Sequence, residues 1–161
     1  MANKFFRTNV APLQPDVVVI SFSVGHEGLP TTQSESAAKI VGESFVERIR
    51  AIVNLAIAIG ALPVVCESHP HDGLNMMQYA VLQDTNLRLA ALGVPNLPML
   101  AYVDDGAGRW KQGFSHDAAH PNAAGHHEMF RGLVPSIAKV FAPAQIEAHR
   151  RALASRRLSI G

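Results

Sequence analysis

The sequence predicts an α/β domain built on a doubly wound parallel sheet with helices on both faces. Three short runs, 17–23, 62–66 and 97–103, are predominantly apolar, and the first is rich in β-branched residues. Such runs lack the polar alternation of a half-exposed strand and are typical of strands buried on both faces. Between them lie longer stretches with apolar residues spaced by three and four. Strands that alternate with helices in this way predict parallel pairing through right-handed crossovers.

The helices are expected over 32–60, 74–92 and 122–141, with a short basic helix after Pro143. Thr32-Gln-Ser-Glu35 has the pattern of a capping box, and Gly60 is placed to end the first helix as a glycine C-cap. Gly42-Glu43-Ser44 falls in the middle of that helix. We therefore divide the chain into an N-terminal extension (1–15), an α/β domain (16–141) and a basic C-terminal tail (142–161).

Length and composition exclude several classes of protein. The 161 residues suit one domain, and Lys+Arg 14 against Asp+Glu 13 gives no charge for binding nucleic acid. One cysteine excludes an internal disulfide framework. No apolar stretch is long enough to span a membrane, and the N-terminus lacks a signal peptide. We expect a cytoplasmic location for the chain as given; a preceding segment would leave the location unknown.

The titratable residues converge on one rim of the expected sheet. In doubly wound sheets, ligands bind outside the carboxyl ends of the strands. The loops at those ends cover 23–30, 67–73 and 104–120, and they carry His26, Glu27, His69, His71, Asp104, Asp105, His116, Asp117 and His120. The rim is therefore the expected site.

The segment from Asp117 to His126 holds the strongest chemical pattern. Asp117 precedes His120 by three residues, so its carboxylate can bind one ring nitrogen and leave the other free as a base. Pro121 favours an extended conformation at His120, and Asn122 is a good N-cap for the next helix. The pattern predicts a base and its orienting carboxylate on a loop.

This segment resembles the last block of the SGNH (GDSL-type) ester hydrolases, Asp-x-x-His-Pro-Asn-x-x-Gly-His. Pro15-Asp-Val-Val-Val-Ile20 also resembles the lead-in to the family's third block, and the likeness covers residues 15–141. The resemblance implies a three-layer flavodoxin-like fold, hydrolysis of a small ester and no cofactor. It also implies a catalytic pair formed by Asp117 and His120.

Two blocks of the family depart from this sequence. The nucleophilic serine of the family lies in a Gly-Asp-Ser turn after its first strand, and no such strand and turn precede Asp16. The serine is thus expected from outside the visible motifs. The third block, Gly-x-Asn-Asp, corresponds to Val24-Gly25-His26-Glu27, so His26 takes the position of the oxyanion donor. Further pocket candidates are Glu27, Ser23, His69, His71 and Ser115, while Ser68 lies on a rim loop.

The missing first strand has a structural consequence. It would leave the strand Val17–Phe22 as an unprotected edge, which favours association. The chain is then a piece of a longer enzyme or a short variant, and a second copy could cover the edge.

Two alternatives to a serine hydrolase remain open at this point. A domain that keeps the fold without the chemistry could act as a binding or oligomerising module. The rim histidines and carboxylates could instead gather around a catalytic zinc ion, although their spacing matches no known zinc motif, and we assign no metal ligand.

Overall fold

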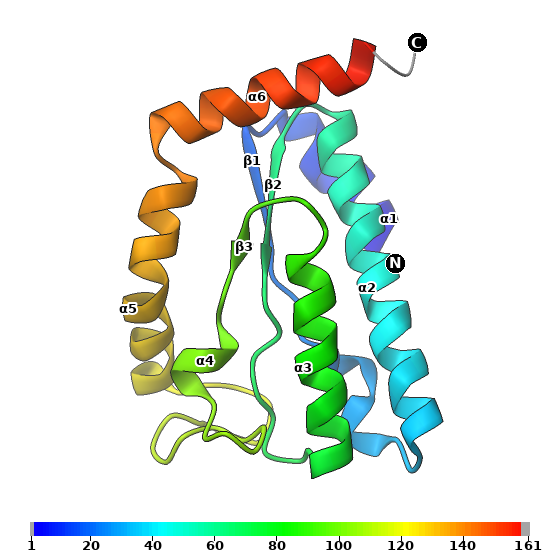
Figure 1. Ribbon diagram of the computed structural model, residues 1–161, viewed down its shortest axis with the longest axis vertical. Helices are drawn as coiled ribbons and strands as arrows, with labels where there is room; N and C mark the ends of the chain where they lie inside the picture. Colours follow the sequence, from blue (N-terminus) through cyan, green and yellow to red (C-terminus); the bar gives the residue numbers. More distant parts are fainter. Residues whose placement is uncertain (1, 159–161) are drawn as a thin grey trace.

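Three short parallel strands form the centre of the computed structural model, which describes residues 2–158 (Figure 1). β1 (Val17–Ile20), β2 (Leu62–Cys66) and β3 (Asn96–Leu97) lie in the order β1-β2-β3. Val17 pairs with Leu62, and Val65 pairs with Asn96. The predicted α/β class with a parallel sheet is confirmed.

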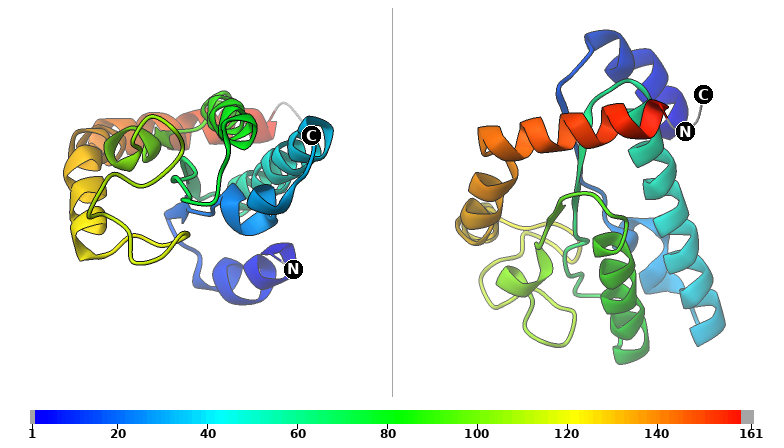
Figure 2. Two further views of the ribbon diagram at one scale, coloured as in Figure 1. Left: turned by 90° about the horizontal axis from the view of Figure 1, so that it is seen from below. Right: turned by 45° about the horizontal axis from the view of Figure 1, so that its top comes forward.

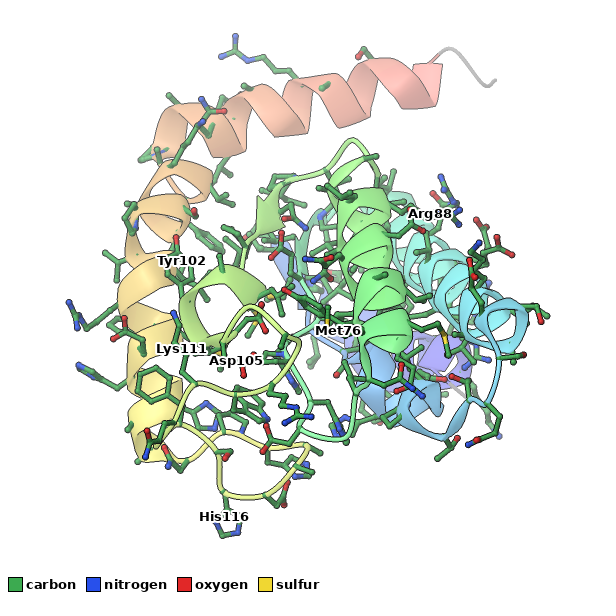
Figure 3. All side chains as sticks on the ribbon, turned by 60° about the horizontal axis from the view of Figure 1, so that its bottom comes forward. Met76, Arg88, Tyr102, Asp105, Lys111 and His116 are labelled. Atoms are coloured by element: carbon green, nitrogen blue, oxygen red, sulfur yellow. The ribbon has the colours of Figure 1, made fainter. Side chains whose placement is uncertain are left out.

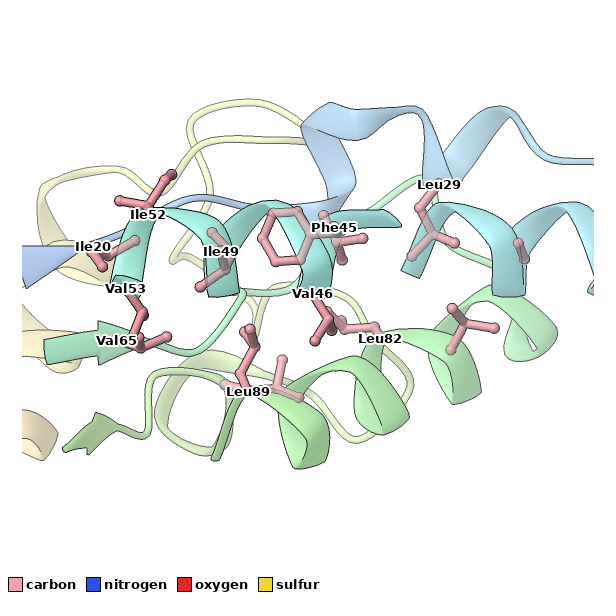
Figure 4. Close-up of a cluster of buried hydrophobic side chains, with 14 of the residues drawn as sticks. Ile20, Leu29, Phe45, Val46, Ile49, Ile52, Val53, Val65, Leu82 and Leu89 are labelled. Carbon is pink, nitrogen blue, oxygen red and sulfur yellow. The ribbon is translucent and has the colours of Figure 1, made fainter. Parts of the chain in front are cut away.

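Helices cover both faces of the sheet. α2 (Glu35–Ala58) and α3 (Met76–Ala90) lie on one side, and α5 (Ala123–Val140) lies on the other (Figure 2). Val65 belongs to the core on the α2 and α3 side, whereas Leu62 and Val64 belong to the core beside α5. All of β2 is buried, which explains its continuous apolar run. Figure 4 shows the larger core, with side chains from α2, α3 and the strands in contact.

The start of α2 differs from the prediction. Ser34 is the N-cap, and its hydroxyl accepts a hydrogen bond from the Ala37 N–H at 3.2 Å. The capping box at Thr32 is therefore wrong, because the Thr32 hydroxyl donates to the Leu29 carbonyl at 2.8 Å and closes the short turn η4 (Leu29–Thr31). The predicted helical end is confirmed, since Gly60 follows α2 with φ 86°.

The third strand is also shorter than predicted. Only Asn96 and Leu97 pair with β2, and Leu100–Val103 form α4. Pro98 has no N–H for a strand ladder, so pairing stops there. The apolar residues beyond it are buried from a helical turn, with Val103 in the core beside α5.

The N-terminal residues are helical. They form α1 (Ala2–Phe5), η1 (Phe6–Val10) and η2 (Ala11–Leu13), and Phe6 is buried in the core on the α2 side. Within residues 2–158, β1 pairs with β2 on one side only, as predicted for an edge strand.

α6 (Pro143–Leu158) crosses the amino ends of the strands, at the end of the molecule opposite the long loops (Figure 1). It is longer than the short helix predicted after Pro143. Among the described residues, no helix has the length and apolar character needed to cross a membrane.

Candidate active site

The loops at the carboxyl ends of the strands are tied to one another by hydrogen bonds. The His71 N–H donates to the Gly108 carbonyl, and the Asp72 N–H donates to the Ala118 carbonyl, both at 2.9 Å. The Asp72 carboxylate accepts from the Trp110 N–H at 2.9 Å. These bonds join the loop after β2 to the long loop after α4, so the rim is one connected structure.

Asp117 and His120 are in direct contact on this rim. Nδ1 of His120 lies 2.9 Å and 3.0 Å from the two carboxylate oxygens of Asp117. Oδ1 of Asp117 also accepts from the backbone N–H groups of Ala119 and His120, both at 2.8 Å. The bond from His120, together with the Ala119 N–H, lowers the pKa of Asp117 to about 2. The carboxylate is therefore ionised, it favours the proton on Nδ1, and it leaves Nε2 free.

The start of α5 fixes the position of this pair. Asn122 is the N-cap, accepting from the Gly125 N–H at 3.0 Å and donating from Nδ2 to the Gly113 carbonyl at 2.8 Å. The Asn122 N–H donates to the Phe114 carbonyl at 2.8 Å. A Cβ on Gly125 would lie 2.3 Å from that same carbonyl oxygen, so only glycine permits this approach. The predicted cap is confirmed, and it binds the start of α5 to residues 113–115 in the middle of the loop.

His26 lies beside His120. It sits in the short helix η3 (Val24–Glu27), which Ser23 caps by accepting from the Gly25 N–H at 3.2 Å. The two imidazole ring centres are 5.1 Å apart, and the rings are tilted by 34°. The loop after β1 and the loop before α5 thus bring two imidazoles together, as convergence on the rim predicted.

The two histidines of the loop after β2, His69 and His71, are half-buried, and His69 is in contact with His26. The ring of His69 meets His26 edge-on at 6.0 Å and lies over the indole of Trp110 at 5.1 Å. Its Nδ1 lies 3.0 Å from the Pro70 carbonyl, so Nδ1 carries the proton. His71 accepts the Gly73 N–H on its own Nδ1 at 2.9 Å. Burial lowers the pKa of both histidines, which favours their neutral forms.

Ser23 and Ser68 on the rim form hydrogen bonds with the backbone of the loops. The Ser68 hydroxyl accepts from the Val24 N–H at 2.7 Å and lies 3.4 Å from Oγ of Ser23. Both serines are buried. The Asn86 side chain accepts a hydrogen bond from the Ser68 N–H and donates one to the Ser68 carbonyl. The backbone of Ser115 bridges that of Pro121. Ser44 lies within α2, where Gly42 packs against α3, as the helical interpretation predicted.

The remaining charged rim residues point to other partners. Glu27 pairs with Arg48 of α2. Asp104 accepts from the Tyr79 hydroxyl at 2.5 Å, while Asp105 accepts backbone N–H groups of its own turn. His116 lies at the tip of the loop and points away from the molecule (Figure 3). Among the described residues, no three His, Cys, Asp or Glu side chains are placed to hold a metal ion. The geometry therefore does not support the zinc alternative.

Trp110 and Asp72 are structural members of the site that the sequence did not predict. Trp110 donates from Nε1 to the Ala118 carbonyl at 3.2 Å and supports His69. Neither residue belongs to a local sequence motif. Their roles can therefore be recognised only from the contacts between loops in the structure.

The chain thus has a parallel three-layer α/β fold, with an aspartate-bound histidine at the carboxyl end of its sheet. The GDSL-like lipase/acylhydrolase family matches residues 1–128, and the chain belongs to this family. Two solved structures have the same fold: a proposed acylhydrolase from Bacteroides fragilis and a GDSL-like lipase from Bacteroides thetaiotaomicron. For each, the TM-score is 0.65 at 19% identity, covering 86% of this chain and 69% of the other. A search of curated proteins found no match.

Proposed function

We propose that this domain hydrolyses small esters, with His120 as the general base and Asp117 as the residue that orients it. The contact of Nδ1 with both oxygens of Asp117 carries this proposal, because it holds the ring in one tautomer and leaves Nε2 for the reaction. Membership of the acylhydrolase family supports the same reaction class.

In the proposed reaction, a serine hydroxyl attacks the ester carbonyl while His120 removes its proton. His120 then gives that proton to the leaving alcohol, and water completes the cycle. An N–H of His26 donates to the oxyanion, the role that an amide has in the family motif. The serine comes from outside the motif positions, because the hydroxyls of Ser23 and Ser68 are buried and bonded to the loop.

Hydrolysis of p-nitrophenyl acetate tests the base. His120→Ala should lower kcat by roughly 100-fold or more, the usual contribution of general base catalysis. His116→Ala is the matched control, because His116 lies in the same loop, is exposed and points away from the molecule. Activity that persists in His120→Ala would contradict the proposal.

We also propose, as a second function, that β1 associates with β1 of another copy. Val19 and Phe22 are 53% and 48% exposed, and the outer edge of β1 pairs with no strand of residues 2–158. Antiparallel pairing would extend the sheet and cover these side chains. Sedimentation should detect a dimer that Val19→Lys weakens, whereas Ile40→Lys, at an exposed position of α2, should not. A monomer at all concentrations would contradict this association.

A further inference from the structure

The close pair of imidazoles suggests a second way to cleave an ester. We propose that His26 and His120 can hydrolyse esters by direct attack of water, in a reaction that needs no serine nucleophile. This activity rests on the proposed function only in taking His120 as the base. It adds a proton donor, His26, and makes the described residues sufficient for turnover.

The distances suit a shared substrate. A ring nitrogen exchanges a proton with an oxygen that it reaches at about 2.6–3.2 Å. With ring centres 5.1 Å apart, the two imidazoles are close enough for one small ester to contact both of them. His26 is exposed, and the side chain of His120 is 59% exposed, so water and a small ester have access to both.

The surroundings give the two rings different tasks. Asp117 binds Nδ1 of His120, so the free Nε2 is suited to accept a proton. His26 has the neutral ring of His69 at its edge, and burial lowers the pKa of His69. A neutral His69 adds no positive charge beside His26. Imidazole exchanges protons readily near neutral pH.

The step balances in atoms and charge. Nε2 of His120 removes a proton from water as the water oxygen bonds to the acyl carbon. The carbon–oxygen bond to the alcohol then breaks, and the leaving oxygen takes a proton from the imidazolium of His26. The products are the acid and the alcohol, and the proton on His120 returns to His26 through solvent.

Replacement of His26 by asparagine separates this role from oxyanion binding. Asparagine can donate a hydrogen bond to an oxyanion, but it cannot transfer a proton. If His26 only stabilised the oxyanion, His26→Asn would keep the activity. If His26 is the acid, the variant loses activity, most strongly on esters whose leaving group needs a proton.

The experiment compares phenyl acetate, a poor leaving group, with p-nitrophenyl acetate, a good one, in the wild-type chain, His26→Asn, His120→Ala and the control His116→Asn. We expect wild-type turnover of both esters, and we expect that treatment with a fluorophosphonate does not reduce this turnover. His26→Asn should lower kcat on phenyl acetate about 100-fold and on p-nitrophenyl acetate much less. His120→Ala should lose both activities.

Other outcomes separate this activity from the proposed function. Loss of turnover when a serine is phosphonylated, or equal kcat values for His26→Asn and wild type, would overturn the water reaction and leave His120 as the base. No wild-type turnover would also overturn it, since water is always present, while a reaction that needs a separate serine would still stand. Turnover that does not depend on His120 would overturn both.

Discussion

A single carboxylate, that of Asp117, both shapes the loop and orients the ring of His120. One oxygen accepts the N–H groups of Ala119 and His120, and both oxygens lie within 3.0 Å of Nδ1. The backbone bonds hold the carboxylate still, so the ring direction is set before any substrate binds. An exposed Asp–His pair without such backbone bonds would do little to fix the orientation of the imidazole ring.

We expect Asp117→Asn to reduce ester hydrolysis more than it disturbs the fold. The amide oxygen can still accept the backbone N–H groups, but it no longer supplies the charge that favours protonated Nδ1. The value of kcat should fall by about 100-fold or more, while the circular dichroism spectrum is unchanged.

Asp105→Asn is the matched control, because Asp105 is an exposed carboxylate that accepts N–H groups of its own turn. Equal kcat values for the two variants would exclude an orienting role for Asp117.

At the scale of elements, the junction between the long loop and α5 depends on close backbone approach. Gly125→Ala would place a methyl group 2.3 Å from the Phe114 carbonyl oxygen and 3.0 Å from Cβ of Pro121. Neither neighbour is a flexible side chain, so the helix start must shift. We expect a loss of about 1–3 kcal/mol in the free energy of unfolding by urea denaturation.

His126→Ala, at the next and exposed position of α5, should change this free energy much less. If Gly125→Ala had the same free energy of unfolding as wild type, the close approach at Gly125 would not contribute to stability.

The sequence predicted elements where local chemistry decides them. β2, the glycine after α2 and the Asn122 cap follow from hydrophobic pattern and hydrogen-bonding groups nearby in the chain. The third strand is shorter than predicted. The prediction followed the apolar residues beyond Leu97 and did not take into account that Pro98 ends strand pairing. The contact of Asp117 with His120 was predictable from spacing. The hydrogen bonds of Trp110 with Asp72 and Ala118 were not predictable, because they depend on how separate loops pack against each other.

At the scale of the whole molecule, acid should destabilise the fold through His69. Burial lowers the pKa of His69 from 6.5, so below that pH the unfolded chain binds more protons than the folded one. The free energy of unfolding should therefore fall as the pH drops from 7.5 to 5.5, with His71 acting in the same direction.

Urea denaturation at the two pH values measures this loss, and His69→Gln should make it smaller. His127→Gln, at an exposed position of α5, should leave it unchanged. A pH dependence of the same size in His69→Gln and wild type would contradict the assignment.

The chain contains one tryptophan, Trp110, and its indole packs on His69 while donating to the loop that carries Asp117 and His120. Its fluorescence is therefore a built-in optical probe of the rim, free of signal from any other tryptophan. Substrate arrival, loop opening or protonation of the neighbouring imidazole would each change the emission, and a stopped-flow instrument could follow them without any label.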